Sequence, residues 1–371
     1  MKNNNLNIAI LTPNKNPYSE TFIQAHKNYL KGTVFYYYGA ISNMKLENHN
    51  SITNKYINLL LKVYINFFNK PRRYLKEYFI IKSLKKQKID VVLVEYGDHS
   101  FNLLNILKAT KLPVVVHFHG HDAVRKNIVK NCNNYKDVFL MASKVIAVSK
   151  VMYQRLLGLG CPKQKLIYNT YGPNPDFELV KAQFSKKQFI AIGRFTDKKA
   201  PYYTILAFKE VLKKHPNATL LMAGDGYLFN ICKNLIKYYN LENSVKLLGI
   251  ITPEIFRNLL QESLAFVQHS ITAEDGDMEG TPLAVLEASI AGLPVISTYH
   301  AGIPDVIIHG KTGLLCKEHD VLSMSQHMLQ VLDDVSFAKK LGAAGKINIK
   351  NNFSMEKHID KLQNIIEIAK S

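Results

Sequence analysis

The chain has 371 residues, of which 47% are hydrophobic and 21% are charged. A chain of this length forms about two domains and buries enough apolar surface to fold without disulfides. The composition excludes an intrinsically disordered, collagen-like or coiled-coil protein, and no apolar run approaches the ~18 residues of a membrane-spanning helix.

Positive charge is concentrated in the first half of the chain. The formal net charge is +19, and residues 1–180 contain 26 Lys and Arg against 10 Asp and Glu. Residues 55–88 alone contain ten basic residues against one acid, Glu77. We expect two domains with different partners, of which the basic one meets an anionic surface, either a nucleic acid or a membrane.

The termini and cysteines indicate a protein of a reducing compartment. Residues 6–11 form an apolar stretch too short for a secretory signal, so we expect a first strand there. The four cysteines stand far apart without a CxxC pair, which favours buried thiols over a zinc site or a disulfide framework. The expected location is the cytoplasm.

Short apolar runs, which predict buried strands, alternate with segments of helical periodicity along the whole chain. The first series of expected strands covers residues 8–11, 34–38, 90–95, 114–117, 145–148 and 166–168. The second series covers residues 189–192, 219–222, 245–248, 265–268, 295–297 and 313–315. This alternation predicts an α/β protein with parallel sheets.

A turn-forming segment at residues 171–176 separates the two series. We therefore expect one domain over residues 1–172 and a second over residues 173–354. The amphipathic residues 355–371 are expected to pack back on the first domain.

Residues 52–68 have the pattern of a helix with a wide apolar side. Its polar residues recur at spacings of three and four, at Lys55, Asn58, Lys62, Asn66 and Asn69. The helix is expected either to lie in the core with a solvated basic side or to lie in a membrane interface. The charge asymmetry favours the membrane.

The strand expected at residues 189–192 ends at Gly193, and Arg194 and Lys199 follow. Open α/β sheets bind ligands at the carboxyl ends of their strands. Two cations there suit a diphosphate, because Arg offers a fork of donors and Lys a point charge. The alternative is a pair of ordinary surface cations.

A second constellation follows at residues 274–288. Thr281 is expected to be the N-cap of a helix whose first residue is Pro282, and a helix N-terminus binds anions. Glu279 and Glu287 flank this terminus. The order carboxylate, anion site, carboxylate matches the sugar, diphosphate and ribose of a sugar nucleotide. The alternative is an acid of the first helical turn and a solvated helix residue.

Glu279 to Glu287 match the E-x7-E motif of retaining glycosyltransferases with the GT-B fold. Together with Gly193, Arg194 and Lys199, the chain resembles glycosyltransferase family 4 of bacterial surface-polysaccharide pathways. Further similar segments lie at residues 17–23, 117–122, 147–149, 223–226, 301–305 and 310–313. The resemblance implies two Rossmann-like domains that face each other across a cleft.

The resemblance also implies roles for individual residues. Arg194 and Lys199 would bind the donor diphosphate and stabilise the leaving nucleotide, Glu279 would bind the donor sugar, and Glu287 would bind the ribose. The rest of the implied donor site comprises Gly193, Gly280, Thr281, Pro282 and Leu283 beside phosphate and sugar, with Gly249 and Ile251 beside the base. His119 would reach the transferred sugar; its alternative role is that of a core histidine. Ser19 and Glu20 would lie on the acceptor side.

The implied reaction transfers a hexosyl group from a UDP- or GDP-sugar, with retention, to an acceptor saccharide expected to be lipid-linked. No cofactor and no metal are expected, because no Asp-x-Asp ends a strand and the two cations can stabilise the leaving group. We expect a peripheral enzyme on the inner face of the cytoplasmic membrane, in lipopolysaccharide, capsule or exopolysaccharide biosynthesis.

Two other classes remain open. One is a sugar-nucleotide epimerase or hydrolase on the same fold. The other is a basic nucleic-acid-binding protein. The aromatic residues of 56–68 share a helical side with Leu and Ile, which suits lipid better than nucleic acid, so no nucleic-acid partner is expected.

Overall fold

Two open sheets, one mainly and one wholly parallel, build the two units of the protein with their helices. The structure is a computed structural model that describes residues 6–15, 20–49, 52, 55–69 and 71–371. The first unit comprises residues 1–148, 152–169 and 359–371, and the second comprises residues 149–151 and 170–358. The chain thus enters the second unit at residue 170, close to the boundary expected from the sequence at residue 172.

The first unit contains a seven-stranded sheet in the order β3-β2-β1-β4-β5-β6-β7. Its strands are β1 (Asn7–Thr12), β2 (Thr33–Tyr38), β3 (Lys45–Leu46), β4 (Val91–Glu95), β5 (Val114–Phe118), β6 (Lys144–Ala147) and β7 (Leu166–Tyr168). All six expected strands are present and pair in parallel. The unexpected β3 pairs antiparallel with β2.

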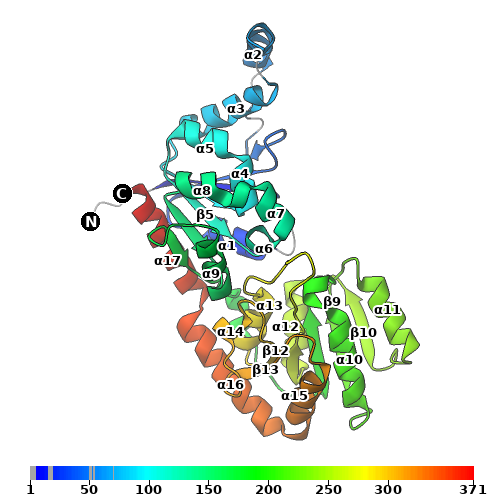
Figure 1. The fold of residues 1–371 in the computed structure, drawn as a ribbon. Coiled ribbons are helices and arrows are strands. Elements are labelled where there is room, and N and C mark those ends of the chain that lie inside the picture. Colours follow the sequence, from blue (N-terminus) through cyan, green and yellow to red (C-terminus); the bar gives the residue numbers. More distant parts are fainter. Residues whose placement is uncertain (1–5, 16–19, 50–51, 53–54, 70) are drawn as a thin grey trace. The chain divides into compact units, whose positions relative to one another are not determined.

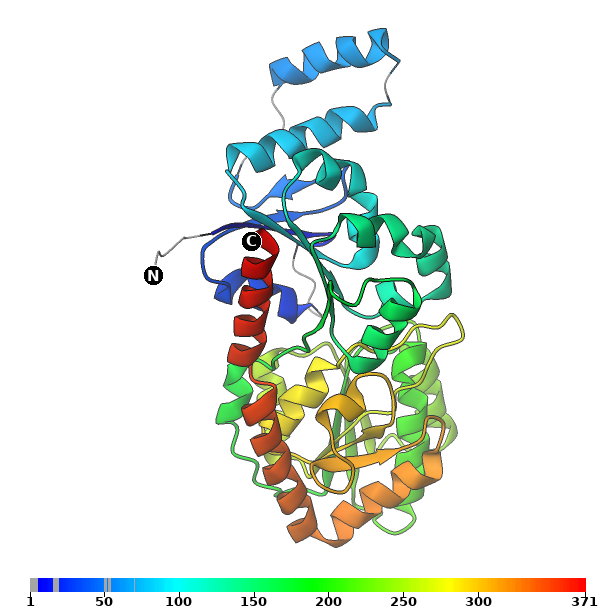
Figure 2. The ribbon, with the colours of Figure 1, turned by 60° about the vertical axis from the view of Figure 1, so that its left-hand side comes forward.

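Helices surround this sheet (Figure 1). They are α1 (Thr21–Tyr29), α2 (Lys55–Phe67), α3 (Arg73–Lys86), α4 (Gly97–Asn102), α5 (Leu104–Thr110), α6 (His121–Val124), α7 (Lys126–Asn131), η1 (Asn133–Tyr135), α8 (Lys136–Met141), α9 (Lys150–Gly158) and α17 (Met355–Lys370). The last helix is joined to the first unit by Lys370 Nζ, 2.9 Å from Asp90 Oδ1, and by Gln363 Oε1, which accepts from the Lys31 N–H. Figure 2 shows this red helix beside the blue N-terminal segments.

The second unit contains a six-stranded parallel sheet in the order β10-β9-β8-β11-β12-β13. Its elements are η2 (Pro175–Leu179), β8 (Gln188–Ile192), η3 (Asp197–Lys199), α10 (Pro201–Leu212), β9 (Thr219–Ala223), α11 (Phe229–Tyr238), β10 (Val245–Gly249), α12 (Pro253–Glu262), β11 (Ala265–Val267), α13 (Leu283–Ile290), β12 (Val295–Thr298), α14 (Ile303–Val306), β13 (Gly313–Cys316), α15 (Val321–Asp333) and α16 (Val335–Asn352). All six strands of the second expected series are present. Because parallel crossovers are right-handed, the reversal of strand order at β8 and β11 distributes helices over both faces.

The helix predicted at residues 52–68 is confirmed as α2, which lies beyond α3 at the outer end of its unit (Figure 1). One side of α2 packs through Ile57, Leu61 and Ile65 against Leu75 and Phe79 of the α3 region. The other side exposes large apolar side chains, namely Tyr56, Leu59, Leu60, Val63 and Phe67. The apolar residues of α2 therefore lie on two sides of the helix, one packed against α3 and one open.

Two further findings concern the described part of the chain. The four cysteines are free, buried thiols, as the sequence predicted. In the ranges that the structure describes, no helix combines the length and the apolarity needed to cross a bilayer.

Candidate functional site

The carboxyl end of β8 carries the first half of the expected donor site. Gly193 follows the strand, and the exposed Arg194 comes next. Lys199 ends the short turn η3, and its side chain turns back so far that a Cβ on Gly193 would lie 3.3 Å from Lys199 Cε. Gly193, Arg194, Lys199 and Gln268 line a hollow at this edge of the sheet.

Lys199 joins this hollow to the acidic loop that precedes α13. Its Nζ lies 3.2 Å from Glu279 Oε2 and 3.2 Å from Gln268 Oε1. Burial lowers the pKa of Lys199, and Glu279 opposes that shift. Burial alone would raise the pKa of Glu279, but Lys199, Lys198 and His300 bring it below its usual range. The two side chains therefore form a largely buried ion pair, in which Lys199 lines the hollow.

Lys198 has a separate role that the sequence analysis missed. Its buried side chain points to Asp277 Oδ1, 3.1 Å away, and to the Met278 carbonyl, 3.2 Å away. No sequence signal distinguished it from its neighbour Lys199, because both are lysines in one turn. Lys198 binds the acidic loop to η3.

The helix after this loop begins later than predicted. Pro282 is the N-cap of α13 with extended backbone (φ −64°, ψ 122°), and its own side chain makes no capping hydrogen bond. The prediction that Thr281 is the N-cap and Pro282 the first helical residue was therefore wrong by one position. The physical reason is a tertiary contact: the Gly302 N–H donates to the Gly280 carbonyl, and a Cβ on Gly302 would come within 2.4 Å of Thr281 Oγ1.

A chain of hydrogen bonds holds the backbone of Glu279. The Glu279 N–H donates to His300 Nε2 at 3.1 Å, and His300 Nδ1 lies 2.6 Å from Glu318 Oε1. Glu318 also accepts from the Thr272 N–H at 2.8 Å. This arrangement requires the proton of His300 on Nδ1. The sequence analysis missed it because His300 and Glu318 lie outside the E-x7-E segment.

Glu287 lies on α13, about one turn beyond the start of the helix. Its side chain is half-buried among apolar neighbours, and burial raises its pKa to about 7. Such a carboxylate gains from a ligand that offers hydroxyl donors. Among the expected base-binding residues, Gly249 ends β10 with positive φ (+67°) and Ile251 follows it, half-buried.

Two glycines after β9 bring its end close to that of β8. A Cβ on Gly224 would lie 1.9 Å from the Gly193 carbonyl oxygen, and a Cβ on Gly226 would lie 2.4 Å from the Phe195 carbonyl oxygen. Both have positive φ. Only glycine permits this approach of two backbones beside the hollow.

His119 and Glu20 belong to the first unit. His119 follows β5, is buried, and its Nε2 lies 2.7 Å from Glu95 Oε2. Its N–H and that of Gly120 donate to the Asp122 carboxylate. Glu20 is the N-cap residue of α1. Ser19 lies outside the described residues. The structure thus brings Gly193, Arg194, Lys199 and Glu279 together, while His119 stands in its own cluster.

Solved structures share this architecture and show the fold. The chain matches a crystal structure of Anabaena Alr3699/HepE in complex with UDP (TM-score 0.75, 14% identity, 98% of this chain and 99% of that one). It also matches a glycosyltransferase from Rickettsia africae (TM-score 0.76, 19% identity, 99% and 100%). The fold is that of the GT-B glycosyltransferases.

Sequence comparisons also lead to glycosyltransferases. The family model for glycosyl transferases group 1 matches residues 177–348, and the model for Glycosyltransferase Family 4 matches residues 44–171. The amylovoran biosynthesis glycosyltransferase AmsK of Erwinia amylovora is 29% identical over 75% of this chain and 70% of its own length. The putative colanic acid biosynthesis glycosyltransferase WcaL of Escherichia coli is 27% identical over 65% and 61%. Both halves of the chain therefore match models of glycosyltransferases.

Proposed function

We propose that the protein transfers a hexosyl group from a nucleoside-diphosphate sugar to a lipid-linked saccharide, with retention and without a metal, in cell-surface polysaccharide biosynthesis. The observation that carries this proposal is that Arg194 and Lys199 line one hollow and that Lys199 pairs with Glu279. The names of AmsK and WcaL, which refer to amylovoran and colanic acid, support a polysaccharide product.

The donor diphosphate would lie between Arg194 and Lys199, near the start of α13. Arg194 is exposed and the side chain of Lys199 is 15% exposed, so one cation can capture the phosphates and the other can neutralise charge in a drier environment. The backbone from Gly280 to Leu283 would add N–H donors. Gly249 and Ile251 would border the base, and HepE, which has been solved with UDP, makes UDP the first nucleotide to try.

The chemical step needs charge stabilisation more than it needs a nucleophile. The bond between the anomeric carbon and the β-phosphate oxygen breaks, and the acceptor oxygen bonds to that carbon on the same face. The acceptor's hydroxyl proton passes to the departing phosphate oxygen. Arg194 and Lys199 would stabilise the negative charge that grows on the phosphate, and Glu279 would bind the sugar as positive charge grows there.

Two further groups complete the proposed donor and acceptor sites. Glu287 would accept hydrogen bonds from the ribose hydroxyls, which do not change during reaction. His119 would contact the transferred sugar, and Ser19 and Glu20 would lie on the acceptor side.

The open side of α2 supports a membrane-bound acceptor. Tyr56 and Phe67 are 83% and 81% exposed, and Leu59 and Leu60 are 65% and 69% exposed. Contiguous exposed apolar side chains mark interaction surfaces, and the exposed cations of α3, such as Lys82 and Lys85, suit anionic lipid. We propose that this helix pair lies on the inner face of the cytoplasmic membrane.

One experiment tests the proposal as a whole. UDP- and GDP-sugars are screened by thermal shift, since a donor at 100 times its Kd adds about 2.7 kcal/mol to the free energy of unfolding. The stabilising donor is then incubated with lipid-linked saccharide, with and without EDTA, and the anomeric configuration of the product is read by NMR.

Three outcomes would contradict parts of the proposal. An inverted product excludes retention. Activity lost in EDTA and restored by magnesium excludes the metal-free step. Nucleotide release at an equal rate without acceptor identifies a hydrolase instead.

A further inference from the structure

A cavity in the first unit lies between the segment that follows β2 and the helix α3. Its volume is about 200 Å³, which is room for several waters or for a group of the size of a phosphate. Three buried side chains, Met44, Leu46 and Phe79, form an apolar floor. Lys45 and Lys76 belong to the wall. The cavity therefore combines an apolar surface with two ammonium groups.

The floor of this cavity is held in place by contacts within the unit. Tyr37 on β2 is fully buried, and its hydroxyl oxygen lies 2.9 Å from Ser83 Oγ on α3. Phe79, one turn before Ser83, belongs both to the floor and to the cluster that packs α2 against α3. The cavity thus lies in the part of the unit that also carries the open side of α2 (Figure 1).

The positive charge in the wall is not neutralised by nearby acids. Within the part of the chain that the structure describes, neither Lys45 nor Lys76 forms an ion pair. Residues 39–88 contain two acids, and both pair with other cations. The pairs are Glu47 with Lys27 at 2.5 Å and Glu77 with Arg73 at 2.8 Å. Because Lys76 is half-buried, its charge is partly desolvated, and an anion in the cavity would compensate for that.

A phosphate group that carries a hydrocarbon chain suits both parts of this cavity. Ammonium groups bind phosphate as point charges, and the exposed Ser42 and Asn43 in the wall can donate further hydrogen bonds. A phosphate without a chain would leave the apolar floor in contact with water, whereas the first carbons of a lipid would cover it. The open side of α2 in the same part of the unit favours a ligand that comes from a membrane.

We propose that this cavity binds the phosphate group of a lipid, with the phosphate at Lys45 and Lys76 and the first carbons of the chain on the floor at Phe79. The inference deepens the proposed function and rests on its membrane-bound acceptor. Two lipids present this chemistry, namely a phospholipid of the bilayer and the lipid that carries the acceptor saccharide. In the second case the enzyme contacts its acceptor at a group that is independent of the saccharide.

Soluble probes separate binding in the cavity from adsorption to a bilayer. The full chain, saturated with UDP, is titrated by calorimetry with three phosphates: geranyl phosphate, dihexanoyl phosphatidylglycerol below its micelle concentration, and inorganic phosphate. We expect at least one lipid probe to bind about tenfold or more tightly than inorganic phosphate, because buried CH₂ groups add affinity. Tighter binding of geranyl phosphate indicates the lipid of the acceptor, and tighter binding of the phosphatidylglycerol indicates a phospholipid.

Three variants locate the binding. Lys76→Gln should weaken the tighter lipid probe about tenfold or more, the usual loss of a hydrogen bond to a charged group. Lys86→Gln is the matched control, because Lys86 is an exposed lysine of the same helix outside the described wall of the cavity. Ser42→Phe narrows the cavity without a change of charge and should weaken the same probe. The Kd for UDP should stay constant, because its proposed ligands lie in the second unit.

The outcomes separate this inference from the proposed function. Equal affinities for inorganic phosphate and for both lipid probes overturn the inference, and so do equal losses in Lys76→Gln and Lys86→Gln. Either result leaves sugar transfer to a lipid-linked saccharide untouched. A lipid probe that binds the wild type and is lost in Lys76→Gln and Ser42→Phe supports the cavity, even if no donor sugar is transferred, and in that case the proposed function alone is contradicted.

Discussion

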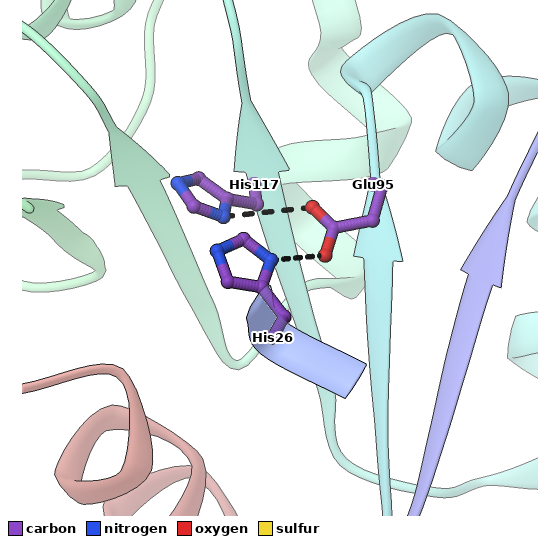
Figure 3. Close-up of side chains that lie close together, drawn as sticks. All are labelled: His26, Glu95 and His117. Atoms are coloured by element: carbon purple, nitrogen blue, oxygen red, sulfur yellow. Dashed lines mark hydrogen bonds and ion pairs between the residues drawn. The ribbon is translucent and has the colours of Figure 1, made fainter. Parts of the chain in front are cut away.

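The two sheets carry different chemistry at the same topological position. In each, strand order reverses beside the first strand, at β1 and β4 in one unit and at β8 and β11 in the other. Glu95 ends β4 and contacts imidazoles, whereas Gln268 follows β11 and contacts the ammonium of Lys199. The same doubly wound fold thus places a carboxylate with its hydrogen-bond donors at the reversal point of the first sheet (Figure 3). At the reversal point of the second sheet it places a lysine with its polar partners.

The comparison also shows that net charge does not locate a site. The first half of the chain holds most of the excess positive charge, yet the reversal point of its sheet holds a buried carboxylate. The excess is found instead on and around α2 and α3. The nearly neutral second half places its few decisive cations, Arg194 and Lys199, at the edge of the sheet. The net charge of a domain indicates which surfaces it approaches, whereas the residues at its strand ends determine the chemistry of its site.

The largest expected effect comes from removing the ammonium group of Lys199, near the point where the strand order of the second sheet reverses. Lys199→Gln should lower kcat about 100- to 1000-fold, the usual loss when one donor to a developing anion is removed. Lys187→Gln is the matched control, because Lys187 is an exposed lysine at the opposite end of β8. Steady-state kinetics with the true donor decide. Equal losses in both variants would show that charge in general, and not this position, matters.

Replacing apolar side chains on the open side of α2 should weaken membrane binding. Burying a leucine contributes about 1.5–3 kcal/mol, so Leu59→Asn with Leu60→Asn should weaken binding to phosphatidylglycerol vesicles at least about 100-fold. Leu179 and Leu322, which are 77% and 66% exposed, provide a control pair in the second unit. Sedimentation at two salt concentrations is the measurement. Unchanged binding in the α2 variant, or no binding by the wild type, contradicts the membrane surface.

The two glutamates of the E-x7-E segment should differ in what they weaken. Glu287→Gln should lower the affinity for free nucleoside diphosphate about 10- to 150-fold, since a hydrogen bond to a charged group contributes about 1.5–3 kcal/mol. Glu279→Gln should bind it at least as well as the wild type, because Lys199 loses its competing partner, and should lower kcat instead. Calorimetry with the nucleotide alone checks both. Equal losses of nucleotide affinity would refute this division.

The smallest expected effect is a pH dependence. Burial raises the pKa of Glu287 to about 7, and its ionised form is the stronger acceptor for ribose hydroxyls. Nucleotide affinity should therefore be highest above pH 7 and fall by up to about tenfold on going to pH 6. The same titration with Glu287→Gln gives the pH dependence that comes from the nucleotide's own phosphates, and this is subtracted from the wild-type curve. Parallel curves for the two proteins would show that Glu287 does not titrate in this range.

The sequence predicted the fold well because its strands are buried on both faces. Such strands appear as continuous apolar runs, and all twelve expected ones occur. The strand β3 has only two residues, Lys45 and Leu46, too few to form a pattern. Thr281 and Pro282 illustrate a different limit: their local preferences favoured a cap that the contact with Gly302 overrides.

The candidate site was predicted only where one segment carries the pattern. Glu279 and Glu287 stand on one stretch of chain, so their spacing was visible. Glu95 was not recognised, because it ends an apolar run and its partners His26 and His119 are 69 and 24 positions away. Only the parallel pairing of β4 with β5 and the packing of α1 bring these side chains together.

Lys198 and Lys199 are neighbours in one turn, yet they hold the acidic loop in different ways. Lys198 binds Asp277 and the Met278 carbonyl, away from the residues that line the hollow. Lys199 binds Glu279 at the hollow itself. On the proposed function, a donor diphosphate would compete for the contact between Lys199 and Glu279 and would leave that of Lys198 in place. The loop would then stay anchored while Lys199 exchanges partners, and the conformational entropy of ordering the loop would be lost in folding rather than in each turnover.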